Sequence, residues 1–297
     1  MNHESSIPIE PLYHYCSSEA FHAIITGRKI RLSALNLSND TMEGKMLSKI
    51  IGTYSTKDNL NNEAHEKLVR HLDRFQEIFC GLGFCLSSEG DLLSQWRGYA
   101  DNGRGLSIGF SRDSIKKIED NYTGTEYDFG VSLCQVKYKD DEHECELRQH
   151  YDELRNLITS DEYRIKQRRI TLAELMSLHS HKPGSNTSYS TIQDQFLKKL
   201  IKMQPCLFSL KSSAFAEEKE WRLVSLRFED KLSDCGFSPN EGKIVPYFEI
   251  ELPDHETTIT EVILGPKHET SISTIDELLK KCGFENVKVK KSKASYR

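Results

Sequence analysis

The stretch Phe215-Ala-Glu-Glu-Lys-Glu-Trp-Arg-Leu-Val224 carries the strongest fold signal in this chain of 297 residues. Its second half continues to Leu226 and reads as a buried β-strand, with apolar side chains at Trp221, Leu223, Val224 and Leu226. Strands are normally poor in glutamate, and neighbouring carboxylates repel each other. A strand that begins inside an acidic cluster therefore breaks a local rule, and such conflicts are expected at functional sites.

The acidic cluster consists of Glu217, Glu218 and Glu220. Side chains alternate between the two faces of a strand, so this alternation predicts that Glu218 and Glu220 share one face. Arg222 falls on the same face, close enough to form an ion pair with Glu220. The cluster is thus either an acid pair with a chemical role or a solvated turn followed by an ordinary ion pair.

The composition limits the class of protein. Hydrophobic residues make up 37%, charged residues 29%, and the formal net charge is −5. No apolar run reaches the roughly 18 residues of a membrane helix, and the N-terminus lacks a basic stretch followed by an apolar one. We expect a cytoplasmic protein without a membrane partner. The eight cysteines form no Cys-x-x-Cys motif, so we expect reduced thiols and no metal site.

On both sides of this strand, toward the two ends of the chain, the sequence alternates between strand and helix patterns. Strands are predicted at 12–16, 30–35, 81–86, 106–110, 131–138, 206–210, 221–228, 244–251, 260–264 and 286–291. Helices are predicted at 19–26, 60–79, 92–100, 142–159, 161–178, 190–203 and 270–282. This order predicts a single α+β domain over residues 1–297 with a helical insertion at about 139–203.

Two groups near the N-terminus offer polar chemistry. His14 lies in the first predicted strand between two tyrosines; it is either a half-buried structural histidine or a ring N–H donor to an amide or ribose hydroxyl. Asn39, Asp40 and Glu43 occupy one polar loop. They cap a helix in the simpler interpretation and bind a metal or a ribose in the other.

The segment Ser94-Gln-Trp-Arg-Gly-Tyr99 follows a predicted strand. Trp96 and Tyr99 are three residues apart and lie on one helical face. Such a pair belongs to a core or forms a stacking wall for a planar ring. The sequence contains no Gly-x-Gly-x-x-Gly, no P-loop and no Gly-x-Ser-x-Gly motif. A Rossmann dehydrogenase, a P-loop nucleotidase and an α/β-hydrolase are therefore disfavoured.

Six motifs together resemble a bacterial family known as a domain of unknown function. They are Leu12-Tyr-His-Tyr15, Asn39-Asp-x-x-Glu43, Trp96-x-x-Tyr99 with Gly105-x-x-Ile-Gly-Phe110, Glu218-x-Glu-Trp-Arg222, Ile263-Leu-Gly-Pro266 and Ser292-x-x-x-Tyr-Arg297. They span nearly the whole chain in this order. Membership of such a family specifies no activity.

The layout is also similar to the ADP-ribosyltransferase superfamily. That resemblance implies a split, mostly antiparallel β-sheet with flanking helices, and NAD as co-substrate in its cleft. It implies NAD-binding positions at His14, Tyr15, Asn39, Asp40, Trp96 and Tyr99. Glu220 would hydrogen-bond the nicotinamide ribose and stabilise an oxocarbenium-like transition state, and Glu218 would orient the acceptor. The spacing leaves open which glutamate is catalytic.

The same resemblance implies a bacterial toxin or phage-defence effector that transfers ADP-ribose to RNA, DNA or a protein. An antitoxin or a regulatory protein is a further partner that it suggests. Two other classes stay open. One is a metal-dependent nuclease that uses Asp40, Glu43, Glu218 and Glu220, with Arg222 or Arg104 on phosphate. The other is a non-catalytic sensor or binding module whose partner surface is the 139–203 region.

Overall fold

The computed structural model of the chain describes residues 10–37, 45–122, 128–161, 192–229, 232–240, 242–253 and 256–296. Asn39, Asp40 and Glu43 lie outside the described residues. So does the predicted helix at 161–178, apart from its first residue.

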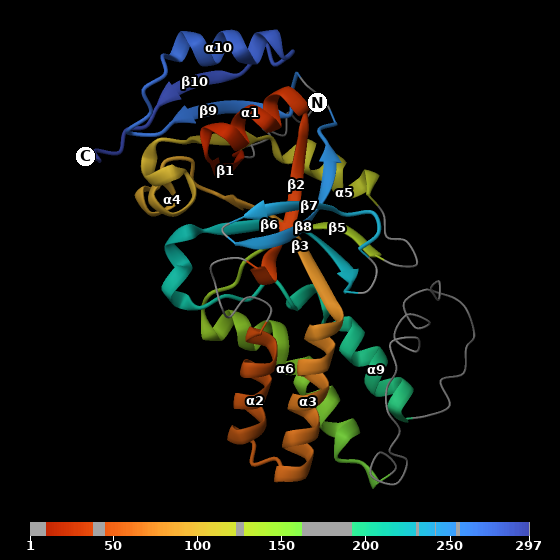
Figure 1. Cartoon of the computed structure of the whole chain (residues 1–297). Coiled ribbons are helices and arrows are strands. Elements are labelled where there is room, and N and C mark those ends of the chain that lie inside the picture. Colours follow the sequence, from red (N-terminus) through yellow and green to blue (C-terminus); the bar gives the residue numbers. More distant parts are fainter. Residues whose placement is uncertain are drawn as a thin grey trace, which may run out of the picture.

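Ten strands of the described chain form one open, mostly antiparallel mixed sheet (Figure 1). They are β1 (Leu12–Cys16), β2 (Lys29–Ala34), β3 (Phe79–Ser87), β4 (Leu106–Phe110), β5 (Asp128–Gln135), β6 (Glu220–Phe228), β7 (Gly236–Asn240), β8 (Lys243–Glu251), β9 (Ile259–Leu264) and β10 (Lys288–Lys291). Their order is β10-β9-β4-β1-β3-β2-β8-β7, with β6 also on β3 and β5 on β6. Only β10 and β9 pair in parallel.

Helices cover both faces of this sheet. They are α1 (Ser18–Gly27), α2 (Met46–Lys57), α3 (Asn62–Ile78), α4 (Leu93–Tyr99), α5 (Arg112–Asn121), α6 (Asp140–Ile158), α9 (Ile192–Lys202) and α10 (Ile272–Lys281). Short 3₁₀ segments include η1 (Leu35–Leu37), η3 (Gln204–Cys206) and η4 (Ser213–Glu218). None of the described helices is long and apolar enough to span a bilayer.

The sheet splits at β3, which pairs with three strands. β6 follows one edge along its whole length, from Phe79 opposite Phe228 to Ser87 opposite Glu220. The other edge is shared: β2 pairs with it near Gly83, whereas β1 pairs with it at Ser87. Between these two pairings, residues 84–86 of β3 pair with neither β1 nor β2, which leaves a gap between the two strands.

Alternation along β6 divides the interior into two cores. Leu223 and the half-buried Trp221 belong to the core that includes α1, α5 and α10. Val224, Leu226 and Phe228 point to the other face and pack among α2, α3, α6 and α9. The helical layer predicted at 139–203 thus includes α2 and α3, which precede it in the chain (Figure 1).

Two local predictions are corrected by the structure. No strand forms at 206–210: Cys206 ends a 3₁₀ turn, and only Leu210 makes an isolated β-bridge, to Lys137. The apolar side chains of this segment instead fill the helical core. In addition, β6 begins at Glu220, so Glu218 belongs to η4 and strand alternation does not relate the two glutamates. All eight cysteines are free thiols.

The close approach of the residue before β4 to the end of β1 makes one glycine essential to the fold. A Cβ at Gly105 would overlap the backbone carbonyl oxygen of Cys16, and the Gly105 N–H donates to Ala100 O at 2.9 Å. Gly98, in contrast, lies on α4 with open space around its Cα.

We expect Gly105→Ala to lower the free energy of unfolding by about 1–3 kcal/mol, because two backbone segments must separate. Gly98→Ala should raise it by about 0.5–1 kcal/mol, because alanine favours the helix. Urea unfolding of both variants measures these changes. Equal effects of the two substitutions would contradict the close contact between Gly105 and the Cys16 carbonyl.

Candidate functional site

A pocket lies at the split of the sheet and encloses about 730 Å³, counting the space open to solvent. Its walls come from six elements far apart in the sequence, β1, η1, β3, α4, η4 and β6, together with Lys211. The lining residues are Tyr13, His14, Tyr15, Leu35, Cys85, Leu86, Gln95, Tyr99, Lys211, Phe215, Glu218, Glu220 and Arg222.

The side chain of His14, which belongs to β1, extends into the gap between β1 and β2 and contacts β3. Its Nδ1 lies 2.8 Å from Cys85 O, and its ring stacks on Phe84 with centroids 4.0 Å apart. Burial lowers the pKa of His14 to about 4, although the Cys85 carbonyl acts in the opposite direction. The ring is therefore neutral near pH 7, and Nδ1 donates its proton to Cys85 O. Nε2 is then an acceptor, whereas the sequence suggested a donor.

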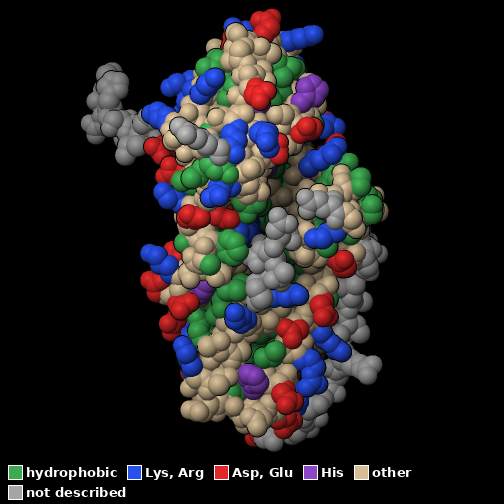
Figure 2. Space-filling model, turned by 60° about the vertical axis from the view of Figure 1, so that its left-hand side comes forward, with side chains coloured by type: hydrophobic (Ala, Val, Ile, Leu, Met, Phe, Trp, Pro, Cys, Tyr) green, Lys and Arg blue, Asp and Glu red, His purple; other side chains and the backbone are tan. Residues whose placement is uncertain are grey.

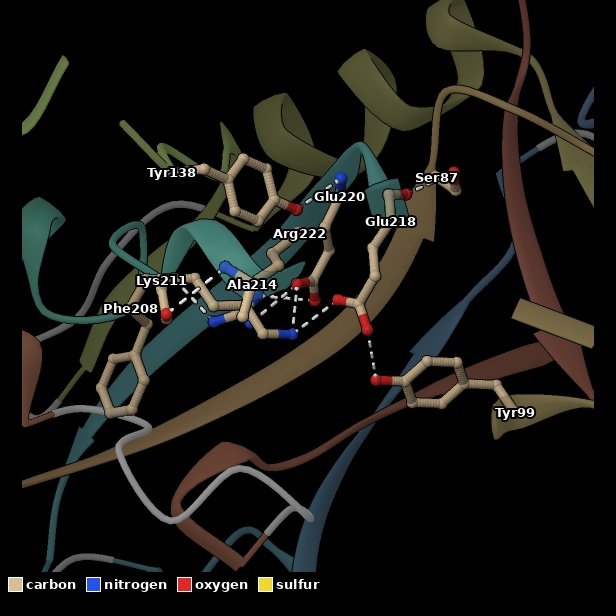
Figure 3. A network of polar contacts seen from close by, with 10 residues as sticks. Ser87, Tyr99, Tyr138, Phe208, Lys211, Ala214, Glu218, Glu220 and Arg222 are labelled. Atoms are coloured by element: carbon tan, nitrogen blue, oxygen red, sulfur yellow. Dashed lines mark hydrogen bonds and ion pairs between the residues drawn. The ribbon is translucent and has the colours of Figure 1, made fainter. Parts of the chain in front are cut away.

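Four buried charged side chains that line the same pocket as His14 form a network of ion pairs (Figure 3). Arg222 binds Glu220 with both arms of its guanidinium: Nε donates to Oε1 at 2.8 Å and Nη2 to Oε2 at 2.9 Å. Lys211 Nζ donates to Glu218 Oε2 at 2.7 Å and to Glu220 Oε2 at 3.1 Å. Two carboxylates and two cations balance, which is the condition for burying such charges together.

The network fixes the ionisation of its members. Burial by itself raises the pKa of Glu220, but Arg222 and then Lys211 outweigh it, so that the pKa lies below its ordinary value. Burial likewise opposes the charge on Lys211, but the two carboxylates raise its pKa above the ordinary value. We infer that both stay charged at neutral pH.

The two glutamates differ in how fully their oxygens are used. Glu220 accepts three hydrogen bonds from Arg222 and Lys211, and the Cys85 side chain also bonds to it. Each Glu218 oxygen accepts one: Oε1 from the Tyr99 hydroxyl at 3.0 Å and Oε2 from Lys211. Glu218 therefore retains a free lone pair on each oxygen for a ligand in the pocket.

Backbone contacts fix the turn that carries these acids. Lys219 adopts a left-handed conformation with φ of 46°, which ends η4 and starts β6. Ser87 Oγ donates to Glu218 O at 2.7 Å, and the Glu220 N–H donates to the Tyr138 hydroxyl at 2.9 Å (Figure 3). This left-handed turn, rather than strand alternation, brings Glu218 and Glu220 to the same cation.

Trp96 does not line the pocket. It is completely buried, packs edge-on against Tyr15, and donates from Nε1 to Asp91 Oδ1 at 2.7 Å. Tyr99 from the same helix is 45% exposed and reaches Glu218. Tyr15 is also anchored, because its hydroxyl donates to Glu89 O and accepts from Leu92 N, both at 2.8 Å.

Of the eight positions predicted to be catalytic or NAD-binding, five line the pocket: His14, Tyr15, Tyr99, Glu218 and Glu220. Asn39 and Asp40 lie outside the described residues. Sequence reasoning missed Lys211 and Tyr138. A signal for Lys211 existed, since it is the only charged residue between positions 206 and 216. A lone lysine in such a stretch is a candidate counter-ion for nearby buried acids.

A magnesium site built on Glu218 and Glu220 is disfavoured by the same contacts. A divalent cation there would have to displace Lys211, and on Glu220 also the bidentate Arg222. The described residues contain no group of three or more His, Cys, Asp or Glu side chains arranged to hold a metal ion. Glu43 and Asp40, the other ligands of the nuclease hypothesis, fall outside them.

Removing one member of the network should leave an unbalanced buried charge. We expect Arg222→Met to lower the free energy of unfolding by about 3–5 kcal/mol. The double variant Arg222→Met/Glu220→Gln should lose less than the sum of the two single variants, because it removes both charges of the pair. Lys280→Met breaks an exposed pair with Asp276 and should change stability little. Additive single losses would show that the pair is not coupled.

The depressed pKa of His14 predicts a pH effect. The unfolded chain takes up this proton near pH 6.5, but the folded chain does so only near pH 4. Stability therefore falls as the pH drops between these values, by about 3 kcal/mol from this residue. From pH 7 to pH 4.5, the difference in unfolding free energy between wild type and His14→Gln should shift by about 2 kcal/mol of this total. A pH-independent difference would contradict the buried, neutral ring.

Comparison with known proteins adds one match. No curated protein and no solved structure matches the chain. Residues 95–223 match the family model described as "Protein of unknown function (DUF2971)". The matched segment contains Tyr99, Lys211, Glu218, Glu220 and Arg222, whereas β1 with His14 and Tyr15 precedes it. The chain thus contains a DUF2971 domain that contributes one side of the pocket.

Proposed function

We propose that the chain is an ADP-ribosyltransferase that takes NAD as co-substrate and transfers ADP-ribose to a macromolecule. One observation carries the proposal. A histidine from the first strand, a tyrosine hydroxyl and the two glutamates at the η4–β6 turn line one pocket at the split of the sheet. These groups come from β1, α4 and the η4–β6 turn, so their meeting depends on the whole fold.

The pocket residues suit the nicotinamide riboside end of NAD. The neutral His14 ring has Nε2 as an acceptor for a carboxamide N–H, and Glu218 has lone pairs for a ribose hydroxyl. Tyr13, Tyr15 and Phe215 supply aromatic surface, which favours a planar ring. A buried carboxylate also favours the positively charged nicotinamide ring over a neutral one.

We assign the catalytic role to Glu218 rather than to Glu220. When NAD is bound, its ribose C1′–N bond breaks with the electron pair leaving on the nicotinamide nitrogen, and C1′ bonds to an acceptor oxygen or nitrogen that gives up a proton. Glu218 supplies negative charge where C1′ becomes positive. It is also a base for the acceptor's proton. Glu220 holds Lys211 and Arg222 in place and so positions Glu218.

The proposal predicts that Glu218→Gln slows nicotinamide release from NAD by about 10²–10³-fold, because it removes one electrostatic contact to the transition state. NAD affinity should change much less, because glutamine keeps the hydrogen-bonding shape. Glu217→Gln is the matched control: this neighbour is exposed on the same turn and should leave the rate unchanged.

Nicotinamide release and labelled ADP-ribose transfer measure the rates, and calorimetry measures NAD affinity. Equal rates in the wild type and Glu218→Gln would contradict the assignment. Failure of wild-type protein to bind NAD at millimolar concentration would contradict the function itself and favour a non-catalytic binding module.

A further inference from the structure

Four basic residues lie on chain segments that hydrogen bonds bring together at the end of the described chain. Arg97, Arg104, Lys267 and Lys293 form no ion pair with any described residue. Two of them lie over the Tyr296 ring: Arg97 Cζ is 5.3 Å and Lys267 Nζ 3.9 Å from its centroid. We call the surface formed by these four cations and Tyr296 the tail surface.

The tail surface is held in shape by hydrogen bonds that involve both main-chain and side-chain atoms. They run from Lys267 N to Gly103 O (2.9 Å), from Lys293 N to Asp91 Oδ2 (2.7 Å) and from Tyr296 Oη to Asn102 Oδ1 (2.6 Å). Asp91 also accepts from Ser292 Oγ at 2.5 Å. The cations are therefore presented by a defined backbone in which the tail, α4 and the loop after β9 are tied together.

The tail surface differs from several other basic sites on the molecule. Lys29, Arg31, Lys116 and Lys280 are exposed too, yet each forms an ion pair with a nearby carboxylate. Lys and Arg side chains are also visible on the upper part of the face that α4 and the C-terminus share (Figure 2). Unpaired cations keep their full attraction for an external anion.

The tail surface and the pocket lie on two sides of α4. Arg97 is two residues from Tyr99, which donates to Glu218 in the pocket. A helix of seven residues is about 10 Å long and about 10 Å wide. A ligand of a few repeating units can therefore contact both sites at once.

We propose that the tail surface binds the phosphodiester backbone of a single-stranded nucleic acid and directs one nucleotide into the pocket. Phosphates are the anions that clustered arginine and lysine side chains bind best. A single strand fits this small surface and can extend a nucleotide across α4, whereas a paired base cannot reach a pocket. The role of that strand as the ADP-ribose acceptor rests on the proposed function; its binding does not.

Fluorescence anisotropy of the whole protein, without NAD, tests binding. The probes are a short labelled RNA, a DNA of the same sequence and the corresponding duplex. We expect one or both single strands to bind more tightly than the duplex. With four phosphate contacts, log affinity should fall against log salt concentration with a slope of about −3. Equal or tighter binding of the duplex would overturn the single-strand assignment.

The variants Arg97→Gln and Lys267→Gln, made together, should weaken binding at least tenfold and reduce the salt slope by about 1.4. The matched control is Lys49→Gln with Lys57→Gln, two exposed lysines on α2 at the other end of the molecule (Figure 1). Equal loss in both double variants would mean nonspecific attraction. Binding of a polyglutamate peptide as tight as the strand would indicate an acidic protein partner instead.

A second measurement separates this inference from the proposed function. The tail-surface variant should transfer ADP-ribose to the bound strand more slowly than wild type, yet release nicotinamide from NAD at an unchanged rate when no acceptor is present. If wild-type protein binds the strand but turns over no NAD, only the proposed function fails. If it turns over NAD but binds no strand, only the tail surface fails.

Discussion

Two carboxylates cannot be buried side by side unless cations are buried with them, and this constraint organises the centre of the molecule. Lys211 satisfies this constraint, because its single ammonium contacts both Glu218 and Glu220. Arg222 completes the balance on Glu220 alone. The arrangement requires the 206–216 segment to lie against the start of β6, which excludes a separate strand there.

The unequal sharing of cations makes two similar residues different. Glu220 is saturated by a bidentate guanidinium, a geometry that gives rigidity but leaves little acceptor capacity. Glu218 shares one ammonium and one phenol, and so keeps its oxygens available while its position is fixed. Glu220 is thus suited to holding its neighbours in position and Glu218 to contacting a ligand, although both residues are glutamates.

The sequence predicted most strands and helices because their period and caps are local properties. It placed β6, β9 and α3 close to their observed bounds, and α1 begins at a Ser17 cap, whose side chain accepts from Ala20 N. It missed α2, α5 and β7, and it predicted a strand at 206–210 from apolar content alone. There the apolar residues serve a core between helix and sheet, which periodicity cannot distinguish from a buried strand.

The candidate site was less accessible to sequence reasoning, because it depends on contacts across the split sheet. Trp96 and Tyr99 have the same helical spacing in either interpretation, and only the fold shows that one is core and the other reaches Glu218. Their helix is held by Asp91 on the side of the tail and by Tyr15 on the side of β1. Arg97 and Tyr99 lie two residues apart on this seven-residue helix, so the same turn of backbone carries a contact to Tyr296 and a contact to Glu218.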